Sequence, residues 1–205
     1  GTYLHWMVAS RAIAELGAAL TALDQCFGFD GEQALDAAHS LANFRGLPHR
    51  LQIIGVRTGC TFIDDSISTT PHATLAGLRS VMGGARVAVI VGGHDRGLDW
   101  SEFAQTVASW TFLDVITQGA NGPRIAAALH AARARCVVRE TYDLAAAVKL
   151  ALGPHVGVVL LSPGAPSFDQ FRDYAERGRE FARLTGFDPA SIGAIKGLAS
   201  REKLR

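Results

Sequence analysis

From residue 51 onward, short apolar runs alternate with segments of helical periodicity, and this alternation constrains the fold more than any other feature. Val87–Val91 and Val156–Leu161 are the most apolar runs, and the first ends at Gly92-Gly93. Strands that are apolar along their whole length are buried on both faces, which is typical of parallel sheets covered by helices on both sides. The sequence therefore predicts an α/β fold with a Rossmann-like, mostly parallel sheet.

Periodicity and capping residues set the expected bounds of the elements. Strands are expected at residues 51–56, 61–63, 87–91, 115–117, 136–138 and 156–161. Helices are expected after the N-cap Thr70, with Pro71 at the first helical position, and at residues 99–108, 123–132 and 144–152. Ser167, three residues before Gln170, is expected to open a capping box and with it the last long helix.

The chain is expected to divide near residue 46. Residues 1–45 carry apolar side chains at helical spacing. Pro48 cannot continue a helix and favours an extended conformation at Leu47. We therefore expect a short helical segment at 1–45 and an α/β domain at 46–205.

Charge and composition exclude several classes of partner. Lys and Arg number 20 against 19 Asp and Glu, a net charge of +1, so neither nucleic acid nor an anionic membrane is an expected partner. No apolar run is long enough to span a bilayer, and no export signal opens the sequence. The widely spaced Cys26, Cys60 and Cys136 fit a reduced, cytoplasmic protein without a disulfide or a metal site.

Polar residues follow three of the predicted strands. These segments are 64–71, with two carboxylates and four hydroxyls, 92–97, with two glycines and Arg96, and 161–167, a turn rich in glycine and proline. Ligands of open parallel sheets bind at the carboxyl ends of the strands, and free N–H groups at helix starts favour anions. Each segment taken alone is equally or better explained as an ordinary turn.

Several common catalytic motifs are missing from the sequence. It contains no GxxxxGK[ST] phosphate loop, no GxGxxG after a strand, no HExxH and no GxSxG. We therefore do not expect these residues alone to hydrolyse a nucleotide efficiently.

The order and spacing of four motifs resemble the C-terminal domain of the Mur ligase family, in particular its MurD-type branch. The motifs are Gly46–Arg50, Asp65-Ser66 with Thr69, Gly92-Gly93 with Asp95-Arg96, and Leu161–Gly178 with its Ser167-Phe168-Asp169-Gln170-Phe171 segment. The resemblance implies the fold of that domain. It assigns residues 1–45 to the helical end of the central ATP-binding domain and the connector that leads into the C-terminal domain.

The resemblance also implies a reaction, in which ATP and Mg²⁺ activate the carboxylate of UDP-N-acetylmuramoyl-L-alanine as an acyl phosphate and the amine of glutamate forms the amide. Arg50 and Asp65 match the family's ATP-binding positions, where Arg50 would face phosphate and Asp65 the ribose hydroxyls. The N-terminal and central domains, which would hold most of the Mg²⁺ contacts, lie outside this sequence. The fragment alone is therefore expected to be inactive, and none of its residues is assigned a catalytic role or a role as a metal ligand.

Four further residues match positions that hold glutamate in the family: Thr69, Arg96, Ser167 and Tyr174. The family has Lys at Arg96 and commonly Phe at Tyr174. Ile67 replaces a family Lys, so the sequence leaves open whether D-glutamate or L-glutamate, with a later epimerase, is added. A non-catalytic binding module derived from a ligase is the alternative from another class.

Overall fold

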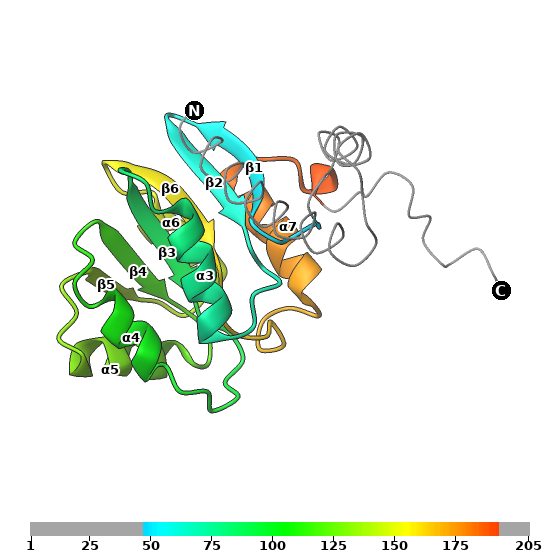
Figure 1. The fold of residues 1–205 in the computed structure, drawn as a ribbon. Coiled ribbons are helices and arrows are strands. Elements are labelled where there is room, and N and C mark those ends of the chain that lie inside the picture. The colour runs from blue at the N-terminus through cyan, green and yellow to red at the C-terminus, as the bar shows by residue number, and fades with distance from the viewer. Residues whose placement is uncertain (1–46, 193–205) are drawn as a thin grey trace, which may run out of the picture. The chain divides into compact units, whose positions relative to one another are not determined.

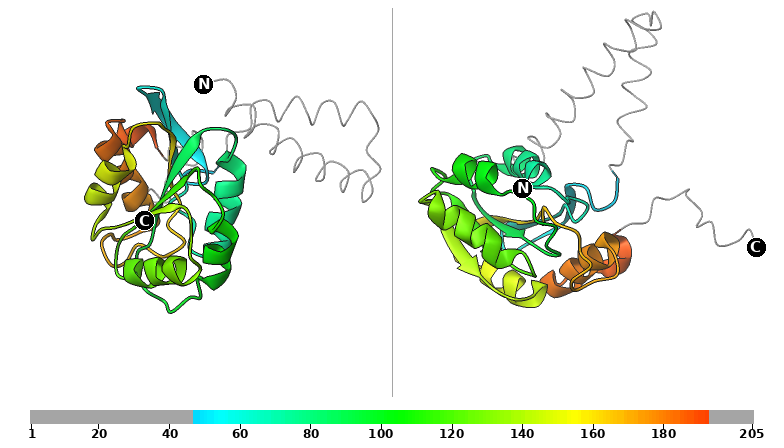
Figure 2. Two further views of the ribbon diagram at one scale, coloured as in Figure 1. Left: turned by 90° about the vertical axis from the view of Figure 1, so that its left-hand side faces the viewer. Right: turned by 90° about the horizontal axis from the view of Figure 1, so that it is seen from below.

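A computed structural model describes residues 47–192, which form one six-stranded sheet with helices on both faces (Figures 1 and 2). The strands are β1 (Gln52–Arg57), β2 (Cys60–Asp64), β3 (Arg86–Val91), β4 (Leu113–Thr117), β5 (Val137–Glu140) and β6 (Val156–Leu161). The helices are α3 (Pro71–Val81), α4 (Ser101–Val107), α5 (Gly122–Ala131), α6 (Leu144–Ala151), α7 (Tyr174–Thr185) and the 3₁₀ turn η1 (Pro189–Ser191). The helical segment predicted at 1–45 lies outside these described residues.

The sheet order is β1-β2-β6-β3-β4-β5, and its last five strands run parallel. Only β1 is antiparallel, because it forms a hairpin with β2 through a tight turn at Thr58 and Gly59, both with positive φ. The mostly parallel α/β sheet predicted from the apolar runs is confirmed. β3 and β6, the two most apolar runs, lie side by side at its centre, with Val89 beside Leu160.

Two helical layers cover the sheet. Helices α3, α4 and α5 contact one another in sequence order, while α6 and α7 pack together against the other face (Figure 2). The core beneath α6 and α7 contains side chains from four strands, among them Phe62, Ile90, Ile116 and Val159, and Phe181 of α7 packs against them. The side chains of Cys60 and Cys136 are buried free thiols, and burial raises the pKa of both.

The start of α3 follows the sequence prediction. Thr70 has an extended conformation, and its Oγ1 accepts a hydrogen bond of 3.2 Å from the backbone N of Ala73, with Pro71 at the first helical position. The helix therefore begins at a fixed residue directly after the polar loop that follows β2.

The predicted start of the last helix at Ser167 is wrong. Ser167 opens a turn in which its carbonyl accepts from the backbone N of Gln170 and Phe171, and α7 begins seven residues later, capped by Asp173. The capping box fails because the side chain of Gln170 is used elsewhere. Its Nε2 donates to Gln118 Oε1 at 2.6 Å and its Oε1 accepts from the backbone N of Leu144 at 3.3 Å.

The connections change sides of the sheet at the carboxyl end of β6. The chain leaves β2 and β3 toward the layer of α3 and α4, but it leaves β6 toward α7 on the opposite face. A change of side between neighbouring strands marks the position where open α/β sheets generally bind ligands. No helix among residues 47–192 is long and apolar enough to cross a membrane.

Candidate functional site

The three polar segments predicted to follow strands meet at one edge of the sheet. The backbone N of Asp65 donates to the carbonyl of Leu161 at 2.8 Å, which joins the loops after β2 and β6. The loops after β3 and β6 are joined by hydrogen bonds from Gly92 N to Pro163 O, at 2.7 Å, and from His94 N to Pro166 O, at 2.9 Å. The fold therefore assembles one site from segments far apart in the sequence.

Asp65 directly follows β2 at this edge and is only 5% exposed. Its Oδ2 accepts a hydrogen bond of 2.7 Å from Ser162 Oγ, and its Oδ1 accepts one of 3.2 Å from the backbone N of Leu51. Burial raises the pKa of this carboxyl to about 6, while the hydrogen bond from Ser162 acts in the opposite direction. Arg50 is exposed and its charge also favours the ionised carboxylate.

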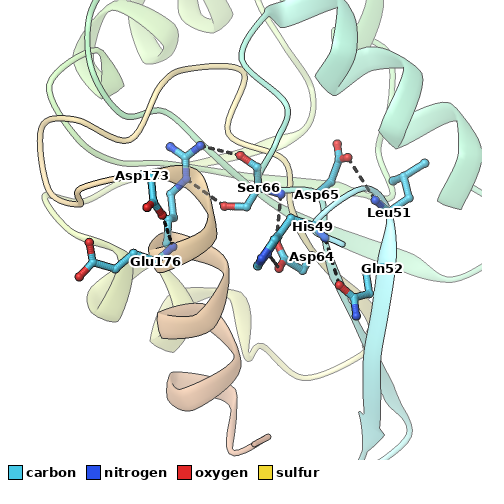
Figure 3. A network of polar contacts seen from close by, with 9 residues as sticks. His49, Leu51, Gln52, Asp64, Asp65, Ser66, Asp173 and Glu176 are labelled. Atoms are coloured by element: carbon cyan, nitrogen blue, oxygen red, sulfur yellow. Dashed lines mark hydrogen bonds and ion pairs between the residues drawn. The ribbon is translucent and has the colours of Figure 1, made fainter. Parts of the chain in front are cut away.

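Next to Asp65, His49 and Asp64 form a buried pair that the sequence analysis did not identify. His49 Nδ1 lies 2.7 Å from Asp64 Oδ2, and Asp64 Oδ1 accepts from the backbone N of Ser66 at 2.9 Å. Figure 3 shows this pair between the start of α7 and the start of β1. A side chain at Gly178 would collide with both members, so glycine is needed at this position of α7.

Tyr174 belongs to the same region, because its ring packs edge-on against the His49 imidazole with 5.7 Å between ring centres. Its side chain is 41% exposed at the first position of α7. The structure therefore brings one of the predicted amino-acid-binding residues against the buried His49–Asp64 pair.

Of the other predicted residues, Ser167 is buried in the turn after β6, Thr69 is half-buried just before the cap of α3, and Arg96 is exposed in the loop after β3. Within residues 47–192, no hydrogen bond or ion pair involves the guanidinium of Arg96. Its loop is held by its neighbour Asp95, which accepts from Gly97 N and pairs with Arg124, and both contacts lower the pKa of the Asp95 carboxyl.

A second residue missed in the sequence analysis is Arg177, on the first turn of α7. Its guanidinium is fully buried and donates to Ser66 in one loop and to Ala165 in another. In the sequence, the only indication of a role for Arg177 is its position beside Gly178 in the last of the four motifs. Among the described residues no group of three or more His, Cys, Asp or Glu side chains could hold a metal ion.

Comparison with known proteins identifies the family. Residues 49–164 match the family described as Mur ligase, glutamate ligase domain. A UDP-N-acetylmuramoyl-L-alanine–L-glutamate ligase of Xylella fastidiosa is 52% identical over 172 residues, which are 82% of this chain and 37% of that protein. A protein of the same name from Xanthomonas axonopodis pv. citri is 51% identical over 185 residues, 88% of this chain and 39% of that protein.

Among solved structures, the chain is similar to the UDP-N-acetylmuramate–alanine ligase MurC of Thermotoga maritima. The TM-score is 0.54 at 21% identity, and the match covers 80% of this chain and 35% of that one, which shows a common fold. The chain therefore belongs to the Mur ligase family and contains its glutamate ligase domain, as the four motifs predicted. It spans 37–39% of the length of the two curated relatives described here.

Proposed function

We propose that the full-length protein is an ATP-dependent ligase that adds L-glutamate to UDP-N-acetylmuramoyl-L-alanine in the cytoplasmic stage of peptidoglycan precursor synthesis. We assign residues 46–205 to its C-terminal domain and residues 1–45 to the end of its central ATP-binding domain. The observation that carries the proposal is the meeting of three loops, with Asp65 and Ser167 in two of them and Arg96 in the third.

The first part of the proposal is a nucleotide subsite at Arg50 and Asp65. Each Asp65 oxygen accepts one hydrogen bond within the protein and retains a lone pair for a further donor, such as a ribose hydroxyl. Arg50 is exposed next to this carboxyl and supplies positive charge for phosphate. Mg²⁺ would supply positive charge against the phosphates of ATP, and we assign its protein ligands mainly to the domains outside this sequence.

The second part is an amino-acid subsite formed by Thr69, Arg96, Ser167 and Tyr174. Arg96 can bind a carboxylate through two parallel hydrogen bonds, and no contact within residues 47–192 occupies its guanidinium. Ser167 and Tyr174 lie in the segment from β6 to α7, so the amino acid would be held between this segment and the loop after β3. These residues would bind and orient glutamate so that its amine faces the activated carboxylate.

We propose L-glutamate as the amino acid because both curated relatives at 51–52% identity carry L-glutamate in their names. A non-catalytic module is disfavoured because Arg50, Asp65, Arg96 and Ser167 are all retained in the loops at this edge of the sheet.

The test is an ADP-release assay on the full-length protein with ATP, Mg²⁺, UDP-N-acetylmuramoyl-L-alanine and glutamate, each omitted in turn. We expect release to require all four components and to match the amide formed. Release that is independent of glutamate, or no release with the complete mixture, would reject the proposal.

A further inference from the structure

Arg177 is a buried cation, and Asp169 and Asp64 are near enough to favour its charged form. Its side chain is fully buried, and burial lowers the pKa of the guanidinium to about 10. Among residues 47–192 no Asp or Glu lies within ion-pair distance of it. A charge without a contacting counter-ion is costly to bury, so the hydrogen bonds of Arg177 must offset much of that cost.

Those hydrogen bonds go to the loops on either side of the site. Nη2 donates to the carbonyl of Ser66 at 2.8 Å and to that of Ala165 at 3.0 Å, and Nε donates to Ser66 Oγ at 3.1 Å. One nitrogen thus bridges the loop after β2 and the loop after β6.

The remaining guanidinium nitrogen, Nη1, faces the loop after β3. Nη1 has no hydrogen-bond partner among residues 47–192 and lies 3.1 Å from the point that a Cβ on Gly93 would occupy. The guanidinium therefore lies where the loops after β2, β3 and β6 meet, next to the segments that contain Asp65, Arg96 and Ser167.

We propose that Arg177 is a positioning residue that fixes the nucleotide-facing loop relative to the amino-acid-facing loops. This inference rests on the proposed function. Asp65 immediately precedes Ser66, and Ser167 lies two residues after Ala165, so a shift of either anchored carbonyl displaces a residue assigned to a substrate. Only a planar guanidinium presents Nε and Nη2 together in this geometry, which a lysine ammonium does not reproduce.

Loss of Arg177 is expected to loosen the loops while the sheet persists. The bond from Asp65 N to Leu161 O and the bond from Ser162 to Asp65 still join the loops after β2 and β6. A displacement of about 1 Å is enough to reduce catalysis roughly 100-fold. Because the guanidinium touches the loops of both subsites, the KM values for ATP and for glutamate should rise together.

The kinetic test uses the full-length enzyme with Arg177→Lys and Arg177→Ala. The matched control is Arg183→Lys on the exposed side of α7, where Arg183 pairs with Glu180. We expect both KM values to rise at least about tenfold in the two Arg177 variants, partial recovery of Arg177→Ala by added guanidinium, and no change in the control. Unchanged KM values with a smaller active fraction, or a rise in only one KM, would overturn the proposal.

A milder variant, Ser66→Ala, removes only the bond to Nε and keeps the test valid if the Arg177 variants do not fold. It should raise both KM values by a smaller factor, and an unchanged pair of values would count against the positioning role.

Hydrogen exchange of the full-length protein separates this inference from the proposed ligase activity. In Arg177→Lys, or in Ser66→Ala if the former is unfolded, amides in segments 65–68 and 165–171 should exchange faster while β3 and β4 remain protected. Equal exchange in wild type and variant, or faster exchange across the whole sheet, would overturn the positioning role whether or not the enzyme ligates glutamate.

Discussion

Ser162 Oγ donates a hydrogen bond of 2.7 Å to Asp65 Oδ2 and so joins two residues 97 positions apart in the sequence. The bond connects the ends of β2 and β6, which are neighbours in the sheet. It also stabilises the ionised form of a carboxyl whose pKa is raised by burial to about 6. The same hydrogen bond therefore joins the two loops and favours the ionised form of Asp65 at the proposed nucleotide subsite.

Asp65 should make the stability of the domain depend on pH. Between pH about 4 and 6 the folded state keeps a proton on Asp65 that the unfolded chain releases, so this carboxyl's contribution to stability decreases as the pH rises. The Asp65→Asn variant should lack this decrease, which amounts to about 2 kcal/mol. Urea unfolding of both proteins at pH 4 and pH 7 tests this, and equal changes in the free energy of unfolding would contradict it.

Ionisation of Asp65 should also control the use of ATP. We expect the KM for ATP to rise as the pH falls below about 6, because a protonated carboxyl is a poorer acceptor for ribose hydroxyls. Ser162→Ala removes a bond that lowers this pKa, so the rise should begin at a higher pH. Steady-state kinetics across this range would show the shift, whereas superimposable profiles would remove Asp65 from the nucleotide subsite.

Arg96 and Arg50 should affect different substrates. Arg96→Ala is expected to raise the KM for glutamate about 10- to 100-fold, the effect of one charge-assisted contact, and to leave the KM for ATP nearly unchanged. Arg50→Ala should show the reverse pattern. Both side chains are exposed, so the melting temperature of each variant should match wild type. Equal effects on both substrates in Arg96→Ala would reject its assignment to glutamate.

The corrected start of α7 can be checked with two further substitutions. Asp173 Oδ1 accepts from the backbone N of Glu176 at 2.7 Å, so Asp173→Ala should cost about 1 kcal/mol of stability. Ser167→Ala should leave the helix cap intact and raise the KM for glutamate. If Ser167→Ala instead causes the larger loss of stability, the roles given to the two residues are reversed.

Much of the fold follows from local sequence signals. The runs at Val87–Val91 and Val156–Leu161 are apolar because both faces of β3 and β6 are covered, and Thr70-Pro71 is a local helix start that needs no tertiary contact. The meeting of three polar loops follows from one general property of parallel sheets, that their carboxyl ends share an edge.

The missed features depend on distant contacts. Arg177 is 111 residues from Ser66, and no periodicity or motif spacing specifies that pair. Asp64 was grouped with the loop, whereas it is the last residue of β2 and pairs with His49 from before β1. Two patterns near the last helix can cap it, one at Ser167 with Gln170 and one at Asp173 with Glu176. The second pattern forms the cap because the side chain of Gln170 is engaged in contacts with distant residues.

The most direct test of the central claim compares the two enantiomers of glutamate in the full-length enzyme. ADP release and amide formation would be measured with ATP, Mg²⁺, UDP-N-acetylmuramoyl-L-alanine and either L-glutamate or D-glutamate as the sole amino acid. The account predicts a higher kcat/KM for L-glutamate. A preference for D-glutamate would contradict the assigned substrate, and turnover with neither would contradict the ligase itself.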